Sequence, residues 1–327
     1  MSPPIFIHSA IADFWRGWPP PVLDPAGPNA SATALLTWAL FGMAALVLVV
    51  VGVALYVALF GKPALRRRLG GTAVIWGAGI AFPVVVLTAL LVWGLTLTSS
   101  LSDPAPRDAL KVRVAGQMWW WRVAYLDDQG QVAVRDANEL HIPVGRPVEL
   151  QLTSYDVIHN FWVPRLSGKL DMIPGRVNTM RIQADEPGVF GGVCAEFCGG
   201  PHALMGFVVV AHPPAEFDRL MADRMRPDPP VRLTAEQQRG ERLFLTAGCA
   251  ACHRIQGTLY NGAAGPDLTH VAARRTLGAG ILQNNRGTLM GWIGNSQAIK
   301  PGNRMPPYTM LSGEDLKALA GYLEPQR

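Results

Sequence analysis

Two long stretches without charge, both in the first hundred residues, constrain the fold of this chain most strongly. Residues 33–60 (TALLTWALFGMAALVLVVVGVALYVALF) and residues 72–98 (TAVIWGAGIAFPVVVLTALLVWGLTLT) contain no Asp, Glu, Lys, Arg or His. A helix rises about 1.5 Å per residue, so each stretch can cross a hydrocarbon layer about 30 Å thick. We therefore predict two membrane-spanning helices, and we expect a neighbouring helix to accommodate Pro83 in the second.

The basic residues between the two stretches predict how they are oriented. The loop at 61–71 contains Lys62 and the arginines at 66–68, whereas the tail at 1–32 contains only Arg16. Such basic loops are retained in the cytoplasm, which places both termini outside. Residues 1–32 lack the basic leader of a secretory signal peptide, so we expect an extracytoplasmic tail; removal of a short leader is the alternative.

The rest of the chain, residues 99–327, is predicted to be a head of two parts. Three prolines in seven residues at 226–232 (RPDPPVR) suit a semi-rigid linker. Before it, apolar and polar residues alternate at 110–114 and 148–153, and this period of two is typical of β-strands. Residues 99–225 are therefore expected to form a small β-sandwich or β-barrel.

Residues 233–327, after the linker, have a helical pattern. TAEQ at 234–237 is a capping box, and Ser312 can cap a helix with one apolar face. Residues 232–327 carry 11 Lys and Arg against 6 Asp and Glu, whereas residues 98–231 carry 13 against 16. Net charges of opposite sign favour docking of the second part of the head on the first.

A cluster of metal-ligating residue types lies in the first part of the head. Residues 194–205 read CAEFCGGPHALM, and His159 stands 35 residues upstream of Cys194. Two thiols, two imidazoles and a thioether form a soft donor set that suits copper. The alternatives are a Cys194–Cys198 disulfide and a zinc site, but neither explains Met205, because a thioether is a poor zinc donor.

These residues resemble subunit II of the haem-copper oxidases, whose dinuclear copper site is known as CuA. The similarity covers about residues 33–212 and includes SYDVIHNFWVPRLSGKLDMIPGR at 154–176. It implies a two-helix transmembrane hairpin followed by a cupredoxin-like β-domain. It also implies that the copper ligands are His159, Cys194, Cys198, His202, Met205 and the backbone carbonyl of Glu196. The carboxylate of Glu196 would help to bind a magnesium or manganese ion at the interface with subunit I.

Three adjacent tryptophans at 119–121 are unusual in a soluble head. Exposed aromatic patches mark interfaces, but alternate residues of a strand pack into the core, so we expect one or two of these rings to be buried. The resemblance implies that Trp119 admits electrons to the copper site.

The second part of the head contains CAACH at 249–253. CxxCH is the signature of covalent c-type haem attachment; zinc binding and a redox-active cysteine pair are the alternatives. With GPDL at 265–268 and NRMPPY at 303–308, the segment resembles class I cytochrome c, which implies an all-α domain. The implied haem contacts are thioether bonds from Cys249 and Cys252, axial bonds from His253 and Met305, and a hydrogen bond from the proximal imidazole to the Pro266 carbonyl.

The remaining candidate ligands are assigned no cofactor. We interpret Met290 and Met310 as core residues, and His8, His141 and His212, which belong to no motif, as structural or solvated. The family often has a glutamate near the start of the second span, at the mouth of a proton channel. Matched on Trp76, this chain has Ala73 there, so we assign no proton-channel residue.

The expected function is one-electron transfer in subunit II of a terminal cytochrome c oxidase of a bacterial inner (plasma) membrane, with the head on the periplasmic or extracellular side. The resemblance implies an external donor, such as cytochrome c or another respiratory redox protein, and subunits I and III as partners. Electrons would pass through the chain's own haem and copper to the oxygen-reducing site of subunit I, coupled to proton pumping. A nitric oxide reductase subunit and a stand-alone electron carrier are the alternatives. Nucleic-acid binding is not indicated by the pI of about 9.2, because 49% of the residues are apolar.

Overall fold

The computed structural model describes residues 20–226 and 232–324. Most of the predicted linker and most of the predicted N-terminal tail, with His8, lie outside these residues. One compact unit is Asn29–Asp103, and the other contains the described residues before and after it. We call residues 104–226, with the segment 20–28, the β-lobe, and residues 232–324 the helical lobe.

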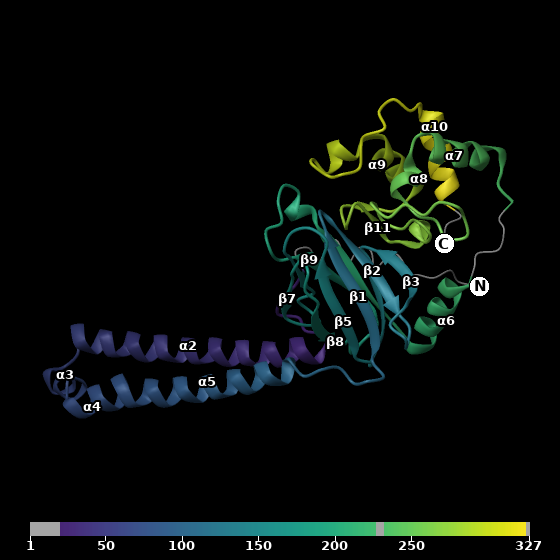
Figure 1. The fold of residues 1–327 in the computed structure, drawn as a ribbon. Coiled ribbons are helices and arrows are strands. Elements are labelled where there is room, and N and C mark those ends of the chain that lie inside the picture. The colour runs from purple at the N-terminus through teal and green to yellow at the C-terminus, as the bar shows by residue number, and fades with distance from the viewer. Residues whose placement is uncertain (1–19, 227–231, 325–327) are drawn as a thin grey trace, which may run out of the picture. The chain divides into compact units, whose positions relative to one another are not determined.

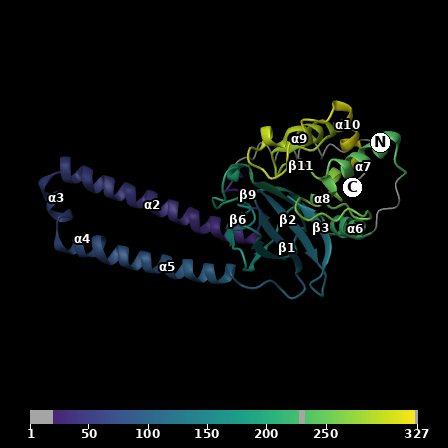
Figure 2. The ribbon, with the colours of Figure 1, turned by 45° about the horizontal axis from the view of Figure 1, so that its top comes forward.

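The unit Asn29–Asp103 contains the two predicted apolar helices. By length and composition, α2 and the segment Thr72–Leu101 could each cross a membrane. The two run antiparallel and are connected through short helices at one end (Figures 1 and 2). The bounds are α2 Pro28–Phe60, α3 Pro63–Leu69, α4 Thr72–Trp76, the π-helical turn η1 Gly77–Ala81, and α5 Phe82–Leu101.

The second apolar helix accommodates Pro83 within its own backbone. Proline lacks the N–H that would bond to the preceding turn, and a π-helical turn is one way in which a helix absorbs such a break. The turn Gly77–Ala81 lies directly before Phe82 and Pro83. The helices also extend beyond the predicted stretches, starting at Pro28 and ending at Leu101. Pro28 suits a helix start, since its missing N–H would have no partner there.

The β-lobe is a sandwich of two five-stranded sheets with strand orders β3-β2-β1-β5-β8 and β4-β10-β9-β6-β7. The first sheet contains β1 Leu110–Gln117, β2 Trp120–Leu126, β3 Val132–Ala137, β5 Val148–Ser154 and β8 Asn178–Ile182. The second contains β4 Glu139–Pro143, β6 His159–Trp162, β7 Lys169–Met172, β9 Gly188–Cys194 and β10 Gly206–His212. The short helices are η2 His202–Leu204 and α6 Pro214–Met225. The predicted β-sandwich is thus confirmed.

The core of the β-lobe lies between the sheets and follows the alternation seen in the sequence. Val112 and Val114 on β1, and Leu150 and Leu152 on β5, are almost fully buried. β1 and β5 pair in parallel, with Val112 opposite Leu150, so that both sets of apolar side chains lie on the same face.

The segment before α2 belongs to the β-lobe. The Ala26 N–H donates to the Arg165 carbonyl at 2.7 Å, and the Ala26 carbonyl accepts from the Asp185 N–H at 2.9 Å. Ala26 is itself buried in the core of this lobe.

The helical lobe is built from three longer helices around an apolar cluster. Its elements are α7 Ala235–Thr246, α8 Cys249–Cys252, η3 Val271–Ala273, β11 Thr276–Leu277, β12 Leu282–Gln283, α9 Arg286–Ile299 and α10 Gly313–Leu323. Both predicted N-caps, Thr234 and Ser312, are confirmed as capping boxes. Helices α7 and α10 cross closely at Gly240, where a Cβ would lie 2.1 Å from the Ala318 carbonyl oxygen. One core prediction is wrong: Met310 is 76% exposed, because it lies in the loop before the Ser312 cap, whereas Met290 packs against the core.

Candidate metal centre and haem site

Five side chains and one backbone carbonyl of the β-lobe converge on one point. His159 begins β6, Cys194 ends β9, and the other donors come from the loop between β9 and β10. Cys194 Sγ lies 3.8 Å from Cys198 Sγ, 3.8 Å from His159 Nδ1 and 3.2 Å from the Glu196 carbonyl oxygen, while Cys198 Sγ lies 3.5 Å from His202 Nδ1 and 3.8 Å from Met205 Sδ. All six predicted copper ligands therefore lie together.

Strand pairing holds the ends of this loop in place. β6 pairs with β9, so that Phe161 lies opposite Cys194, and the Cys194 N–H donates to the Met205 carbonyl at 3.0 Å. Gly116 on β1 leaves room for the imidazole of His159, because a Cβ there would lie 2.5 Å from the ring. The sandwich thus holds Cys194, Met205 and the upstream histidine in place.

The donor set fits a copper site. Cys194, Cys198 and Met205 are buried, and both cysteines are free thiols, which rules out the disulfide alternative in this structure. The hydrogen bond with Cys198 lowers the pKa of the Cys194 thiol well below its ordinary value, against the effect of burial. A thiolate is the form that binds metal. Each cysteine sulfur has its own histidine nitrogen beside it, so Cys194 with His159 and Cys198 with His202 would hold the copper.

Asp156 holds the imidazole of His159 and was missed in the sequence. Its carboxylate accepts from His159 Nε2 at 2.9 Å, which leaves Nδ1 directed at Cys194. The same carboxylate accepts from the N–H groups of Met118 and Val157, and these bonds lower the pKa of Asp156 although burial opposes them. A carboxylate behind a ligating histidine fixes its tautomer and orientation. The spacing DVIH was the available signal.

The three tryptophans have different environments. The indole N–H of Trp119 donates to the Cys198 carbonyl at 2.9 Å. This ring therefore lies against the loop at 195–205 between β9 and β10, which we call the ligand loop or copper loop. Trp120 lies under the guanidinium of Arg122, with 4.5 Å from Cζ to the ring centroid. Trp121 is fully buried in the core, as expected for at least one of the three.

The helical lobe brings together the residues of the CxxCH motif. Cys249 and Cys252 lie on the single turn α8, and both are free. His253 Nδ1 lies 2.7 Å from the carbonyl oxygen of Pro266, as predicted, so Nε2 would be the atom that ligates haem iron. Burial lowers the pKa of His253, so its ring is neutral, the form that ligates iron.

Met305 lies in a loop that is held by hydrogen bonds. Its carbonyl accepts from Ser296 Oγ at 3.0 Å and from Gln297 Nε2 at 2.8 Å. Met305 packs against the same apolar cluster as Cys249. The donors present therefore fit a covalently attached haem.

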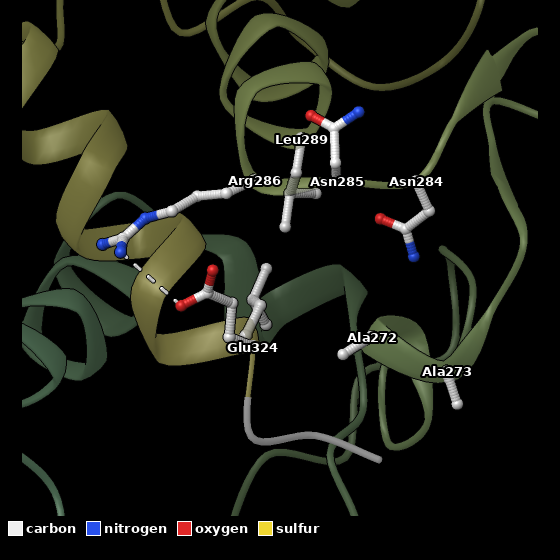
Figure 3. A pocket seen from close by; sticks show the side chains of 8 residues that line it. Ala272, Ala273, Asn284, Asn285, Arg286, Leu289 and Glu324 are labelled. Carbon is white, nitrogen blue, oxygen red and sulfur yellow. Dashed lines mark ion pairs between the residues drawn. The ribbon is translucent and has the colours of Figure 1, made fainter. Parts of the chain in front are cut away.

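A separate pocket of the helical lobe contains none of the predicted ligands. Ala272, Asn284 and Leu289 line it, and Arg286 pairs with Glu324 at its edge at 3.6 Å (Figure 3). We assign no cofactor to it.

Comparisons with known proteins agree with this geometry. Residues 126–212 match the family model "Cytochrome C oxidase subunit II, periplasmic domain", and residues 237–326 match the model "Cytochrome c". The chain is 34% identical over 313 residues to cytochrome c oxidase subunit 2 of Alkalihalophilus pseudofirmus, with 92% of this chain and 89% of the relative covered. The chain belongs to the cytochrome c oxidase subunit 2 family.

Two further members of this family are similar over shorter parts. Cytochrome c oxidase subunit 2 of Bacillus subtilis is 29% identical, with 81% of this chain and 78% of the relative covered. The crystal structure of the periplasmic domain of subunit II (CoxB) from Bradyrhizobium japonicum is 29% identical, covers 38% of this chain and 96% of its own, and has a TM-score of 0.34.

Membership in this family places the chain in an oxidoreductase complex, a cytochrome c oxidase. The subunit II domain implies CuA copper, and the cytochrome c domain implies haem c. When bound, the two groups supply one-electron redox chemistry. The relatives named here are oxidase subunits, so the nitric oxide reductase alternative gains no support from them.

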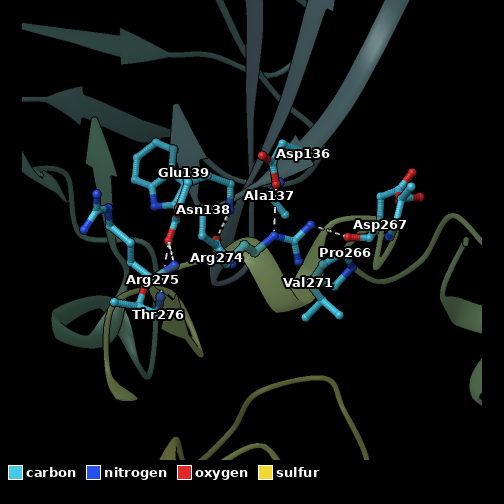
Figure 4. Close-up of polar contacts among 12 residues, drawn as sticks. Asp136, Ala137, Asn138, Glu139, Pro266, Asp267, Val271, Arg274, Arg275 and Thr276 are labelled. Atoms are coloured by element: carbon cyan, nitrogen blue, oxygen red, sulfur yellow. Dashed lines mark hydrogen bonds and ion pairs between the residues drawn. The ribbon is translucent and has the colours of Figure 1, made fainter. Parts of the chain in front are cut away.

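The two lobes of this family member meet at a buried cluster of charges (Figure 4). Asp136 of β3 accepts hydrogen bonds from Arg224 of α6 and, at 2.9 Å, from Arg274 Nε of the helical lobe. All three side chains are at most 5% exposed. Arg224 and Arg274 lower the pKa of Asp136, although burial opposes them, so the group stays a carboxylate.

Two histidines without a motif belong to the same cluster. His141 and His212 stack with ring centroids 5.1 Å apart, and His141 Nδ1 lies 2.9 Å from His212 Nε2. Arg224 Nη2 lies 3.1 Å from His141 Nε2. Burial and the nearby Arg224 lower the pKa of His141, so the ring is neutral. The structural interpretation holds for this pair, and their partners were missed.

Glu139 completes the cluster. Its Oε1 accepts the backbone N–H of Arg275 and, at 3.2 Å, that of Thr276, while Oε2 accepts no hydrogen bond among the described residues and lies 3.9 Å from His141 Nε2. Burial, together with the neighbouring Asp136, raises the pKa of Glu139 from 4.5 to about 7.

Glu139 should make a separate contribution to the pH dependence of stability. The folded state binds a proton here between pH 4.5 and about 7 that the unfolded state releases, so the stability contributed by Glu139 falls as pH rises through this window and is then constant. Glu139→Gln keeps an acceptor for both N–H groups and removes the titration. At 1.36 kcal/mol per pKa unit, the variant should be more stable than the wild type by about 3 kcal/mol at pH 8 and nearly equal at pH 4. Denaturant unfolding at both values checks this, with the exposed Glu186→Gln as control. An equal pH slope in Glu139→Gln and wild type would contradict the prediction.

Proposed function

We propose that this chain carries single electrons from an external donor to the oxygen-reducing subunit of a terminal oxidase. His253 and Met305, with the thioether-forming Cys249 and Cys252, would hold haem c. The copper pair would be held by His159, Cys194, Glu196, Cys198, His202 and Met205, and Trp119 would admit electrons to it. The observation that supports this proposal most strongly is that all six copper donors lie together in the β-lobe. This lobe docks on the helical lobe, which contains the CxxCH motif.

The chain's own residues do the positioning in this scheme. Asp156 orients the imidazole of His159, and the Pro266 carbonyl orients that of His253. Trp119 bonds to the Cys198 carbonyl and so lies against the ligand loop. A rigid β-sandwich limits rearrangement when the charge of the site changes, which favours fast electron transfer.

We further propose that the head lies on the periplasmic or extracellular side of a bacterial inner (plasma) membrane, anchored by two spans. The basic residues of α3, Arg66, Arg67 and Arg68, support a cytoplasmic turn between the spans. Ala26, two residues before α2, bonds to the β-lobe, so the start of α2 lies on the same side of the membrane as the head. This supports an even number of membrane crossings.

The same proposal divides the head into a copper domain at 99–225, a linker at 226–232 and a haem domain at 233–327. The separate apolar cores of the β-lobe and the helical lobe support this division.

The tip of the copper loop is the proposed contact with subunit I. Phe197 is 76% exposed there, and Val157 and Ile158, which precede His159, are 38% and 43% exposed. Exposed apolar groups around a functional loop fit a protein partner. Glu196, next to Phe197, would bind magnesium or manganese at this interface. We place proton pumping in the whole complex, with subunit III as a further partner and no channel residue at Ala73.

Purification in mild detergent tests this function. We expect a large polytopic partner to copurify, together with c-type haem bands, near-infrared copper absorbance and oxygen uptake on reduced cytochrome c. Consumption of nitric oxide but not oxygen would favour a reductase instead. Absence of both partner and turnover would mean a stand-alone carrier.

A further inference from the structure

Lys300 of the helical lobe is buried against the β-lobe. It caps the end of α9 and is only 2% exposed. Its Nζ lies 2.7 Å from the Trp119 carbonyl oxygen, 2.8 Å from that of Leu204 and 2.9 Å from that of Gly278. Burial lowers the pKa of Lys300 to about 7, and the ammonium form has three N–H donors, which match these three carbonyls in number.

Two of the three acceptors belong to the copper site's surroundings. Trp119 donates its indole N–H to the Cys198 carbonyl, and Leu204 directly precedes Met205. The ammonium therefore joins the helical lobe to the tryptophan and to the ligand loop at one point. No ion pair to Lys300 occurs within residues 20–226 and 232–324, so its place is set by backbone oxygens alone.

Further contacts of the helical lobe near Lys300 involve the same loop and Asp156 before β6. The Gly206 N–H, directly after Met205, donates to the Ala279 carbonyl at 3.0 Å. A Cβ at Gly302 would lie 3.6 Å from the ring of Pro201. Arg304, directly before Met305, lies 3.7 Å from the carboxylate of Asp156 that holds His159. The helical lobe therefore contacts both ends of the segment 201–206 beside Lys300.

A second attachment of the helical lobe lies elsewhere, on β3 and β4. There Arg274 bonds to Asp136, and the backbone of Arg275 and Thr276 bonds to Glu139. Arg122 of β2 also donates to the Ala263 carbonyl of the helical lobe. Separate attachments can have different roles: some keep the lobes together, and another fixes their relative orientation. An orientation that is fixed in advance removes the cost of searching for a productive geometry.

We propose that Lys300 is a positioning residue that sets the helical lobe in register with Trp119 and the copper loop for electron transfer between the two sites. This inference rests on the proposed function. It implies that the lobes dock through a built interface and not by the tether alone. It also implies that the Trp119 carbonyl side is closed to external donors, which must deliver electrons to the helical lobe.

The test uses the purified complex with Lys300→Met, which keeps the length and apolar character of the stem but removes the three donors. The matched control is Lys317→Met in the same lobe, where the side chain is 58% exposed and Nζ lies 3.7 Å from Glu236. Hydrogen exchange at the Gly206 amide reports the contact at the copper loop. Exchange at the Arg275 and Thr276 amides reports the second attachment.

In Lys300→Met the Gly206 amide should exchange at least about tenfold faster, while the Arg275 and Thr276 amides keep wild-type protection. Transfer between the two cofactor sites after pulsed reduction of the haem should slow at least about tenfold, with both absorption spectra and the rate of haem reduction by external cytochrome c unchanged. Wild-type exchange at Gly206 together with a wild-type transfer rate would overturn the proposal. So would equal loss of protection at all three amides, because that is general unfolding.

Lys300→Gln keeps the test available if the methionine variant does not assemble. Its amide offers two donors on a shorter stem, so the same two readouts should change in the same direction, and wild-type values would again overturn the proposal. Failure of the proposed function would give a different result from failure of the Lys300 proposal. In that case the wild type itself would show no transfer between the sites, while the Gly206 amide would still depend on Lys300.

Discussion

Replacing Cys198 with serine should abolish copper binding by the β-lobe and leave the haem site intact. Cys198 Sγ contacts Cys194, His202 and Met205, so its loss removes the sulfur that joins both halves of the donor set. Losing a partner behind a metal ligand already costs 10- to 100-fold in affinity or activity, so losing this ligand should reduce oxygen uptake by more than about a hundredfold. Metal analysis and the near-infrared band of the purified complex measure the first effect, and oxygen uptake measures the second.

Ala195→Ser is the matched control for this change, since it adds a hydroxyl to the same loop at a residue that supplies none of the six donors. It should retain the metal and the activity. The c-type haem bands of Cys198→Ser should stay reducible by external cytochrome c. Wild-type copper content in Cys198→Ser would show that the predicted ligand set is wrong.

Asp136→Ala should destabilise the head by about 3–5 kcal/mol, the usual cost of removing one partner from a buried ion pair. The change leaves the guanidinium groups of Arg224 and Arg274 buried without their carboxylate. Because Arg274 belongs to the helical lobe, the loss should also weaken docking of the two lobes. Denaturant unfolding measures the stability, and hydrogen exchange at the Arg275 amide measures the docking.

The exposed ion pair between Asp218 and Arg146, at 3.5 Å, offers the control. Asp218→Ala should change the free energy of unfolding by less than about 1 kcal/mol, because solvent screens exposed charges. A loss of under 1 kcal/mol in Asp136→Ala would mean that the buried cluster does not hold the lobes.

Local patterns were enough to predict most of the fold. Alternation at 110–114 and 148–153 depends on burial of one sheet face, and the caps at Thr234 and Ser312 depend on contacts three residues apart. The π-helical turn before Pro83 was not predictable in this way, because several rearrangements can absorb a proline. The exposure of Met310 was also missed, since an apolar residue in a loop carries no periodic signal.

In the candidate site, too, local sequence patterns predicted some residues and missed others. Five of the six copper donors lie within 194–205, where spacing is informative; His159 stands apart as an isolated histidine 35 residues upstream, and the family resemblance implied its role as a ligand. The roles of these six residues as copper ligands remain predictions. The distances between their donor atoms agree with those roles. The buried cluster joins Asp136 to Arg224 and Arg274 across 88 and 138 residues, and a single sequence has no pattern that links such positions. Net charge predicted only that the two parts attract.

The most direct test of the central claim follows the order in which the two sites of the intact complex are reduced. Oxidised complex is mixed anaerobically with reduced cytochrome c, and the c-type haem band and the near-infrared copper band are recorded together. With reduced cytochrome c in fixed excess, we predict that the haem is reduced first and the copper second. The rate of copper reduction should not change when the complex alone is diluted. Copper reduction that precedes haem reduction, or a copper rate that falls in proportion to dilution, would contradict electron transfer within one chain.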